Sequence, residues 1–598
     1  MWLECLLVSV VCVVLAVAFY LTINRSKFAN KRKFSFVNCL FGGVLAASIV
    51  LFVPVHWMGS KQTAWDICRT ICLSLFNAFK VLTSGCDFEV IETGVAQCDA
   101  RDLATIYLAW SAVLYFAAPI FTATAALTLV KNMSANVKYF FAYTKKVYVF
   151  SELNEKSLVL ASDVRANEEN AAIVFANAFA ADEKHSSDLL EQAKEIDAIC
   201  FKKDILGVNF KRHSDKQEIW FFAIGENESS NLDQTLKLIE KYRDRDNTRI
   251  YVFSTGMESE SLLASADKGN IVVRRVNEVR SLISRQLYEH GELIFNSARE
   301  AEDGTKRISA VVVGMGRHGT EMLKALAWFG QMDGYSLTIN AFDLDPLAEE
   351  KFAAMAPELM SEDYNGVNVP GEAQYLIKVH SGMHVDTLSF ANAIGEITDA
   401  TYVLVALGND DLNINTAMKL RMYFERKKIH PIIQAIVWDP RQKKALRGLK
   451  NFKGQEYDLD LIGDRESSYT TDVIISSVLE QDALERHKGH GSGEDAFWNY
   501  EYNYRSSVAS AIHLKARIKC GIPGADKPEK ALTKEERETI ESLEHRRWNA
   551  YMRAEGYIYS GDQDPSSRND LGKMHHDLVN YALLSEEEKR KDSRVGTV

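Results

Sequence analysis

Cysteine is scarce over most of this 598-residue chain. Seven of the nine cysteines lie in the first hundred residues, so the remaining five-sixths carry only Cys200 and Cys520. This distribution is typical of a protein whose bulk lies in a reducing cytosol. Cys86 and Cys98 stand in a stretch expected to face outward, where the sequence is equally compatible with a disulfide and with two free thiols.

Basic character and catalytic motifs are also lacking. The formal net charge of −11, without a basic domain, argues against a general nucleic-acid binder. No Cys/His set has zinc spacing, and no H-E-x-x-H, P-loop or G-x-S-x-G sequence occurs. His575 and His576 are adjacent, so on a helix they would point to different faces. We therefore expect no metal site and no enzyme.

Long apolar runs are present only near the N-terminus, where three segments are long enough to span a bilayer. They cover approximately Trp2–Ile23, Phe36–Val55 and Leu103–Val130. Lysine and arginine crowd the stretch between the first two segments and the stretch after the third, which places both in the cytosol by the positive-inside rule. We expect a multi-pass plasma-membrane protein with its N-terminus outside and the bulk of the chain in the cytosol.

A further helix is predicted over Ala64–Leu82, but Asp66, Arg69 and Lys80 make it too polar to span the membrane comfortably. It leads into a turn of five pore candidates, which are Thr83, Ser84, Gly85, Cys86 and Asp87. The order span, short helix, Thr-x-Gly turn and span resembles the pore loop of potassium-channel-like proteins, whose carbonyls line the ion path. Three of the five residues differ from the potassium filter TVGYG. The alternative is an amphipathic interfacial helix followed by an extracellular loop.

From about Lys145, short Val/Ile/Phe-rich runs alternate with helical stretches, and this pattern predicts βαβ units around parallel sheets. The pattern occurs twice. The first copy has runs at Val147–Phe150, Ala171–Phe175, Ile196–Phe201, Ile219–Ile224 and Ile250–Phe253, and the second at Ser309–Val313, Leu337–Phe342, Ala373–Val379, Tyr402–Leu407 and Ile432–Val437. The fourth runs match best, with Trp220–Asn227 aligned on Val403–Asp410. We interpret the pattern as a duplication.

Only the second copy has a glycine-rich turn after its first strand. Gly314, Gly316 and Gly319 have the spacing that gives a tight turn, close phosphate approach and close helix–strand packing. The helix that follows offers free N–H groups to a pyrophosphate, and Asp343 at the end of the next run is placed to bind a ribose. The corresponding turn of the first copy, residues 151–157, has no glycine, so phosphate approach there is sterically worse.

The predicted nucleotide site has alternatives that the sequence leaves open. Its candidate residues are Gly314, Gly316, Arg317, His318, Gly319, Asp343 and Asp345, with Asn409 and Asp410 at the end of the fourth strand. Arg317 and His318 fit a phosphate contact and a solvated first helical turn equally well. Asn409 and Asp410 could instead cap the next helix. The glycines could also serve packing alone.

Two such halves behind a membrane segment, with Leu407-Gly408-Asn409-Asp410-Asp411 ending a strand, resemble the TrkA-N/RCK family of potassium-channel and transporter regulatory domains. The resemblance covers about residues 145–490 and is strongest over 308–440. It implies doubly wound parallel sheets, pairing into dimers or tetrameric rings, and regulation by NAD(H), another adenine nucleotide or ions. It carries the candidate residues just given.

The C-terminal region has its own set of motifs. Thr533 and Glu536 form a capping box, and the helix leads into His545-Arg546-Arg547-Trp548 and Glu555-Gly556-Tyr557. With His575-His576-Asp577-Leu578-Val579 and a later Leu-Ser-Glu-Glu-Glu-Lys, these motifs resemble the RyR domain, the repeat unit of ryanodine receptors. Stacking on a base and contact with phosphates suggest the ligand candidates Arg546, Arg547, Trp548, Arg553, Tyr557 and Lys573. The alternative places Trp548 and Tyr557 in a small helical core.

We therefore expect an α/β protein with tandem Rossmann-like (RCK-like) doubly wound parallel sheets. An all-α transmembrane region precedes the sheets and a small, mostly α RyR-like domain follows them. The expected domains are 1–140, 141–300, 301–488 and 489–598. The leading hypothesis is a homo-oligomeric, ligand-gated, ion-channel-like membrane protein controlled by a nucleotide-like ligand, with no nucleic-acid partner. The alternatives are a non-conducting, nucleotide-triggered membrane effector in stress or phage defence, and a membrane-anchored NAD-dependent enzyme.

Overall fold

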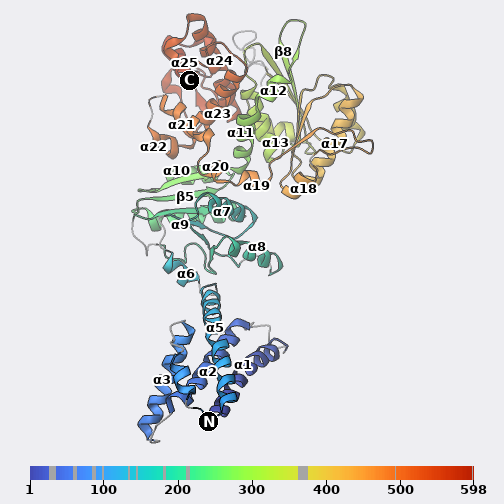
Figure 1. Cartoon of the computed structure of the whole chain (residues 1–598). Coiled ribbons are helices and arrows are strands. Elements are labelled where there is room, and N and C mark those ends of the chain that lie inside the picture. Colours follow the sequence, from blue (N-terminus) through green and yellow to red (C-terminus); the bar gives the residue numbers. More distant parts are fainter. Residues whose placement is uncertain are drawn as a thin grey trace. The chain divides into compact units, whose positions relative to one another are not determined.

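The computed structural model describes residues 1–25, 36–57, 63–83, 89–96, 98, 100–131, 135–142, 146–179, 183–210, 216–360, 375–446, 448–489, 491, 493–595 and 597. These residues divide into two units, Met1–Phe140 and Phe141–Val598. The first unit is helical, and the second contains two large β-sheets, a two-stranded sheet and a group of C-terminal helices (Figure 1).

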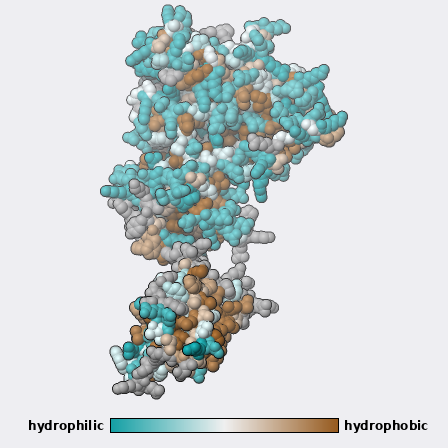
Figure 2. Space-filling view, viewed as in Figure 1, coloured by the Kyte–Doolittle hydropathy of each residue, from teal (hydrophilic) through white to brown (hydrophobic). Residues whose placement is uncertain are grey.

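The first unit consists of helices, three of which are strongly apolar. The helices are α1 (Trp2–Arg25), α2 (Phe36–Trp57), α3 (Ala64–Leu82), α4 (Glu89–Val95), α5 (Arg101–Lys131) and α6 (Ala135–Phe141). By length and composition, α1, α2 and α5 are apolar enough to cross a membrane, over Trp2–Leu21, Cys39–Trp57 and Arg101–Ala123. Hydrophobic residues cover much of the visible surface of this unit (Figure 2). The predicted apolar helices before the α/β part are confirmed, whereas the orientation and the cellular membrane stay predictions.

The first sheet has six parallel strands in the order β3-β2-β1-β4-β5-β6. The strands are β1 (Lys146–Phe150), β2 (Ala172–Phe175), β3 (Ile199–Cys200), β4 (Glu218–Ala223), β5 (Thr248–Phe253) and β6 (Val272–Val276). The helices are α7 (Glu155–Asn167), α8 (Glu183–Glu195), α9 (Glu228–Tyr242), α10 (Met257–Ser265), α11 (Glu278–His290) and α12 (Glu292–Asn296). Its central strands are buried on both faces, which is why their sequences are continuous apolar runs.

The second sheet repeats this order as β10-β9-β8-β11-β12-β13, and a short strand β7 pairs antiparallel with β8. The strands are β7 (Arg299–Glu300), β8 (Lys306–Val313), β9 (Tyr335–Phe342), β10 (Tyr375–His380), β11 (Tyr402–Val405), β12 (Ile432–Ile436) and β13 (Leu459–Ile462). The helices are α13 (Arg317–Phe329), α14 (Ala348–Met355), α16 (Leu388–Glu396), α17 (Asp410–Arg426), α18 (Pro440–Ala445), α19 (Arg465–Ser468) and α20 (Thr471–Ile474). Each of the ten predicted runs contains a strand, so the prediction of two parallel α/β sheets is confirmed. The sequence missed β6, β7 and β13.

Matched asparagines hold the same position in both sheets. Asn227 caps α9 and Asn409 caps α17, and a buried asparagine follows each cap after four residues. Asn231 accepts from Gly225 N–H and donates to the Phe253 carbonyl, 2.8 and 3.0 Å away. Asn413 accepts from Leu407 N–H and donates to the Ile436 carbonyl, 2.6 and 2.8 Å away. The two N-caps, Asn227 and Asn409, therefore occupy equivalent positions. The sequence alignment pairs Asn227 with Asp410 instead, so it is wrong by one residue here.

The C-terminal helices share a hydrophobic core with one face of the second sheet. Val312 and Leu404 of the sheet belong to the same buried cluster as Ile512 and Leu543 of the helices. The elements are α21 (Val478–Gly489), α22 (Glu494–Asn499), α23 (Glu501–Lys519), α24 (Lys534–Ala554) and α25 (Glu586–Val595), with short strands β14 (Ile558–Tyr559) and β15 (Met574–His575) and 3₁₀ turns at Glu529–Ala531, Pro565–Ser567 and Tyr581–Leu583. The predicted capping box at Thr533 and Glu536 starts α24. The domain boundaries at 301 and 489 stay predictions.

We predict that Asn231 and Asn413 contribute about equally to the free energy of unfolding. Asn231→Ala and Asn413→Ala should each lower the free energy of unfolding by about 2–3 kcal/mol, because each leaves a buried N–H and a buried carbonyl without a partner. The exposed Asn392 in α16 provides the control, and Asn392→Ala should change it by less than about 0.5 kcal/mol. Urea unfolding of the full chain in detergent, followed by tryptophan fluorescence, measures all three. Equal values for the buried and exposed variants would contradict the prediction.

Candidate functional site

The glycine turn between β8 and α13 has three glycines with three different surroundings. Gly314 has φ +94°, and a Cβ added there would lie 2.6 Å from the carbonyl oxygen of Ala406 on the neighbouring strand. A Cβ at Gly319 would overlap the carbonyl oxygen of Gly314, so the helix and the strand end are in direct contact. A Cβ at Gly316 would meet no atom within 4 Å. The turn is therefore closed at its first and last glycines and open at the middle one.

The N-terminus of α13 begins at this open glycine. Gly316 is the N-cap, and no side chain among the described residues caps the helix, so the N–H groups of its first turn point toward the open side without a capping partner there. Asp343 follows β9 directly, and its carboxylate accepts from Met315 N–H at 2.5 Å and from Asp345 N–H at 2.8 Å. Asp345 accepts from Leu347 N–H and pairs with Lys351. The predicted acid thus lies against the turn and fixes its backbone.

Arg317 and His318 occupy the first turn of α13 but have different environments. The Arg317 side chain is exposed, and its Nη1 lies 3.2 Å from Oε1 of Glu228 in the first copy. His318 packs 5.5 Å from the Trp438 ring, and its Nε2 is buried without a hydrogen-bond partner among the described residues. Burial lowers the pKa of His318 to about 4, so the ring is neutral at pH 7. Arg317 is therefore the cation here that is available to a phosphate.

Asn409 and Asp410 do structural work at the end of β11. The side chain of Asn409 accepts from Leu412 N–H at the start of α17. Asp410 accepts from the N–H groups of Trp438 and Asp439, each at 2.9 Å. These bonds realise the capping alternative for Asn409 and tie Asp410 to the loop after β12. In the first copy, Glu228 accepts from Thr255 N–H in the same way, at 2.7 Å.

A carboxylate of the chain lies at the corresponding turn of the first sheet. The Oε2 of Glu152 would be 2.8 Å from a Cβ added at Gly225, at the end of β4. Burial raises the pKa of Glu152, partly offset by a hydrogen bond from the backbone of Glu226. The turn itself is tied by Asn154, which caps α7 and donates to the Ile224 carbonyl at 2.8 Å. A phosphate at this edge would meet a carboxylate, in line with the missing glycines.

No protein-family model and no curated protein matches this chain.

A cavity of about 350 Å³ lies among the C-terminal helices. Trp548 and Arg547, two of the predicted ligand residues, line it together with Tyr502, Arg568 and the ring of His575. Trp548 is half-buried and meets His575 edge-on, with ring centroids 4.9 Å apart. Arg547 is buried and donates to Glu544 at 2.7 Å. The cavity combines aromatic walls with paired charges, a composition that suits a planar, hydrogen-bonding ligand.

The other predicted ligand residues of this region lie elsewhere. Arg553 donates to Glu358 at 2.9 Å and to the Leu578 carbonyl, and Arg546 lies 3.7 Å from Asp333. Tyr557 is buried, with its hydroxyl 3.4 Å from Asp570, and Lys573 donates to the Glu555 carbonyl at 2.7 Å. Each of these four residues is thus engaged in holding the C-terminal fold or joining it to the second sheet. Tyr557 belongs to the hydrophobic core, as the core alternative expects, and Trp548 both packs against that core and lines the cavity.

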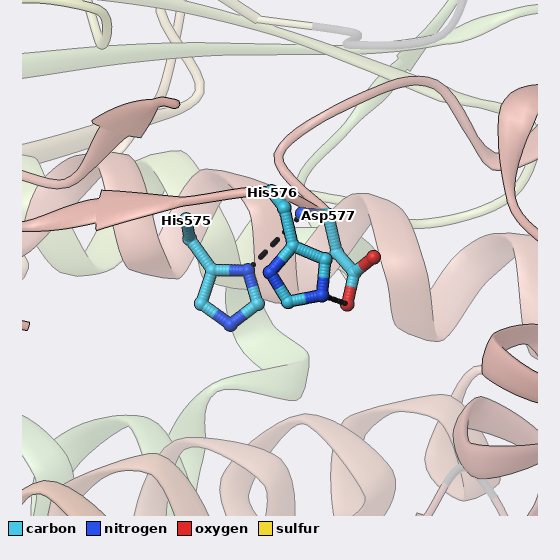
Figure 3. Close-up of side chains that lie close together, drawn as sticks. All are labelled: His575, His576 and Asp577. Carbon is cyan, nitrogen blue, oxygen red and sulfur yellow. Dashed lines mark hydrogen bonds and ion pairs between the residues drawn. The ribbon is translucent and has the colours of Figure 1, made fainter. Parts of the chain in front are cut away.

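His575, His576 and Asp577 form a close cluster on the wall of this cavity (Figure 3). They lie on β15 and the turn after it, so the helix assumed from the sequence is wrong and their ligand atoms lie within 4.8 Å of one another. The Nδ1 of His575 accepts from Asp577 N–H at 3.1 Å. The two rings stack with centroids 4.7 Å apart, which sets their in-plane lone pairs side by side and not convergent. The cluster fits a hydrogen-bonded wall better than a metal site.

The pore candidates fall largely outside the described residues. Four of the five candidates lie outside the described part of the chain, namely Ser84, Gly85, Cys86 and Asp87. The predicted filter turn therefore stays a prediction, as does the question of a disulfide at Cys86. Thr83 is described, and its hydroxyl donates to the Lys80 carbonyl at the end of α3, at 3.1 Å.

Sequence reasoning also missed a larger cavity of about 560 Å³ between α11, α13, α21, α23 and α24. Arg280 on its wall lies 3.2 Å from Glu321 of α13 and 3.0 Å from Glu555 at the end of α24. Arg505 of α23 is 3.2 Å from the same Glu555. These buried charges join the helix of the glycine turn to the C-terminal helices. No local sequence pattern predicts these ion pairs, because their partners are far apart in the sequence.

Gly316 and Gly319 should respond differently to the same substitution. Gly319→Ala should destabilise the chain by about 2–4 kcal/mol, because the new methyl group overlaps the Gly314 carbonyl. Gly316→Ala should change stability by less than about 0.5 kcal/mol, because its Cβ enters open space. Urea unfolding of both variants in detergent measures the difference. A tolerated Gly319→Ala would refute the close contact of α13 with β8.

Acid should destabilise this region through His575. Burial lowers its pKa to about 3, so the folded chain keeps the ring neutral while the unfolded chain binds a proton below about pH 6.5. The stability that depends on the neutral ring is therefore complete above pH 6.5 and is lost as the pH falls toward 3. His575→Gln should lose less Tm between pH 7 and pH 5 than the parent chain does. His290→Gln, at an exposed position, should keep the parental pH dependence.

Proposed function

We propose that this protein is a membrane-anchored receptor for a nucleotide, which binds at the glycine turn of the second sheet. The observation that carries the proposal is the open space at Gly316, set at the uncapped N-terminus of α13. Backbone N–H groups and the helix dipole at such a terminus favour a phosphate. Arg317 adds an exposed cation at the same place, and Asp343 lies beside it on the next strand.

The identity of the fold supports a dinucleotide or an adenine nucleotide as the ligand. Both sheets have the strand order of doubly wound, Rossmann-like folds, in which ligands bind at the carboxyl ends of the strands where the order reverses. The glycine turn follows β8, and β8 lies between β9 and β11 at that reversal. We take the two sheets to be a tandem RCK-like pair in which NAD(H) or another adenine nucleotide occupies the second copy.

The C-terminal cavity is the second ligand site in this proposal. We take residues 489–598 to be an RyR-like domain that binds a nucleotide-like ligand through a base stacked on Trp548. Tyr502 and His575 supply further aromatic wall, and Arg547 and Arg568 supply hydrogen-bond donors. Arg546, Arg553, Tyr557 and Lys573 are not part of this site in the proposal, since their contacts hold the fold.

A phosphate bound at the glycine turn would directly affect a contact between the second copy and the first. Arg317 pairs with Glu228, which also accepts from Thr255 at the end of β5. Burial opposes ionisation of Glu228, but the bonds from Thr255 and the charge of Arg317 outweigh it and lower its pKa. A bound phosphate would compete with Glu228 for Arg317. Ligand binding would then change the contact between the two copies, the first of which follows the membrane helices in the chain.

The output we propose is ion passage through a homo-oligomer, and the protein has no catalytic role. A ligand changes such an equilibrium only by its different affinities for the two states. The departure of Ser84, Cys86 and Asp87 from the potassium filter favours one alternative, a non-conducting membrane effector. A membrane-anchored NAD-dependent enzyme is the third candidate and predicts turnover.

Ligand binding tests the site. The full chain in detergent is titrated with NAD, ADP-ribose, ATP and cyclic nucleotides by calorimetry. Gly316→Trp should abolish binding at the glycine turn, because its side chain enters the open space where the phosphate is expected to bind. Gly493→Trp is the matched control, since Gly493 is also a helix N-cap with open space at its Cβ, and it should keep the parental affinity. Unchanged binding by Gly316→Trp would refute the site.

Reconstitution into liposomes tests the output. The active ligand should start potassium flux in parental vesicles and in Gly493→Trp vesicles but not in Gly316→Trp vesicles, while entrapped calcein stays inside. Release of calcein with the ions would instead support the membrane effector. Conversion of NAD(H) without flux would support the enzyme and refute the receptor.

A further inference from the structure

Helix α3 carries its charges only near its two ends. Asp66 and Arg69 lie in the first two turns, and Lys80 lies in the last. The ten residues from Thr70 to Phe79 are uncharged, and at the rise of an α-helix they extend about 15 Å, roughly half of a bilayer core. The three charged residues lower the mean hydropathy of the whole helix, although its centre is uncharged. By mean hydropathy, α1, α2 and α5 are therefore candidate membrane spans and α3 is not.

The polar residues of this centre face inward. Thr70, Ser74 and Asn77 fall at one face of the helix and are buried against the neighbouring helices. The Nδ2 of Asn77 lies 2.7 Å from Nε2 of His56 in α2, and the Thr70 hydroxyl donates to the His56 carbonyl at 3.4 Å. The hydrogen-bonding capacity of α3 is thus turned toward its own bundle.

The apolar residues of α3 face outward. The exposed fractions are 74% for Trp65, 51% for Ile71, 58% for Phe76 and 57% for Phe79. This arrangement is the reverse of a water-facing amphipathic helix, which would bury its aromatic residues and expose its amide and hydroxyl groups. It continues the outward apolar faces of α1 and α5, where Leu15 and Phe116 are 60% and 72% exposed.

We propose that α3 is a fourth membrane-embedded helix, with its aromatic and aliphatic face against lipid acyl chains and its Thr70–Asn77 face sealed on α2. Water is excluded as the partner of the outward face because four large apolar side chains would be left in contact with it. A second copy fits less well, because membrane helix interfaces favour small residues and this face presents large ones. The long stem of Arg69 allows its charge to reach the headgroups from the first turns.

The proposal decides between the two alternatives for this segment and gives the bundle a polar interior. An interfacial helix would present Thr70, Ser74 and Asn77 to water, and these are the residues that are buried. The hydroxyls of Ser48 on α2 and Ser74 on α3 are also buried, and neither has a hydrogen-bond partner among the described residues. Polar groups in a membrane interior face the bundle in this way and mark functional positions.

Spin-label accessibility in liposomes tests the proposal on the full chain. Phe76→Cys is made in a background whose native cysteines are serine or alanine, and the label is exposed to oxygen or to a water-soluble nickel complex. Three labelled controls accompany it: Ile120→Cys on α5 for lipid, Asp244→Cys in the second unit for water, and Asn77→Cys for the buried face. A variant that keeps only Cys72, an exposed native residue of α3, serves if Phe76→Cys folds poorly.

The label at position 76 or 72 should collide several-fold more with oxygen than with nickel, as the label at 120 does. The label at 77 should be shielded from both reagents. A nickel preference like that of position 244 would overturn the proposal in favour of a water-facing helix. Shielding from both reagents with spin–spin broadening between labels would also overturn it, because a second copy would then cover the face.

Discussion

The contact between Gly319 of α13 and the carbonyl of Gly314 is the constraint on which the fold around the second sheet depends. Only a residue without a side chain lets the helix rest on the strand end, and this position aims the free N–H groups of α13 past Gly316. The same placement brings Glu321 to Arg280 and, through it, to Glu555. This close contact therefore determines both the open edge of the second sheet and the attachment of that sheet to the C-terminal helices.

Buried charge gives that attachment its specificity. Arg280, Arg505 and Glu555 are largely shielded from water, with 21%, 17% and 12% of their side chains exposed, and each would be costly to leave unpaired. The nearby carboxylates raise the pKa of Arg280, and although burial opposes it, the charges of Arg280 and Arg505 lower the pKa of Glu555. All three groups are therefore charged at neutral pH. An interface made of such pairs tolerates little sliding, since a shift of one partner leaves another unpaired.

The sequence reveals the parts of the fold that rest on local patterns. Apolar runs located ten strands, and glycine spacing located the turn at 314–319. Strand β6 escaped notice because Arg274 and Arg275 interrupt it, and both are matched by Glu480 and Glu501 from distant helices. Strand β13 alternates aspartate with leucine and isoleucine at the edge of its sheet. The Glu228–Arg317 pair and the two cavities join segments far apart in the chain, so no window of sequence contains them. The exposed aromatic face of α3 likewise needs its neighbours to be recognised.

Glu152 gives the duplication a further meaning. The two halves share one strand order, but Glu152 places a carboxylate beside Gly225 in the first, whereas the Gly316 position of the second is open. A carboxylate that belongs to the chain itself would repel a phosphate at this edge. In a receptor of the kind proposed, the first half would stay unchanged when the nucleotide binds, and the second half would change relative to it.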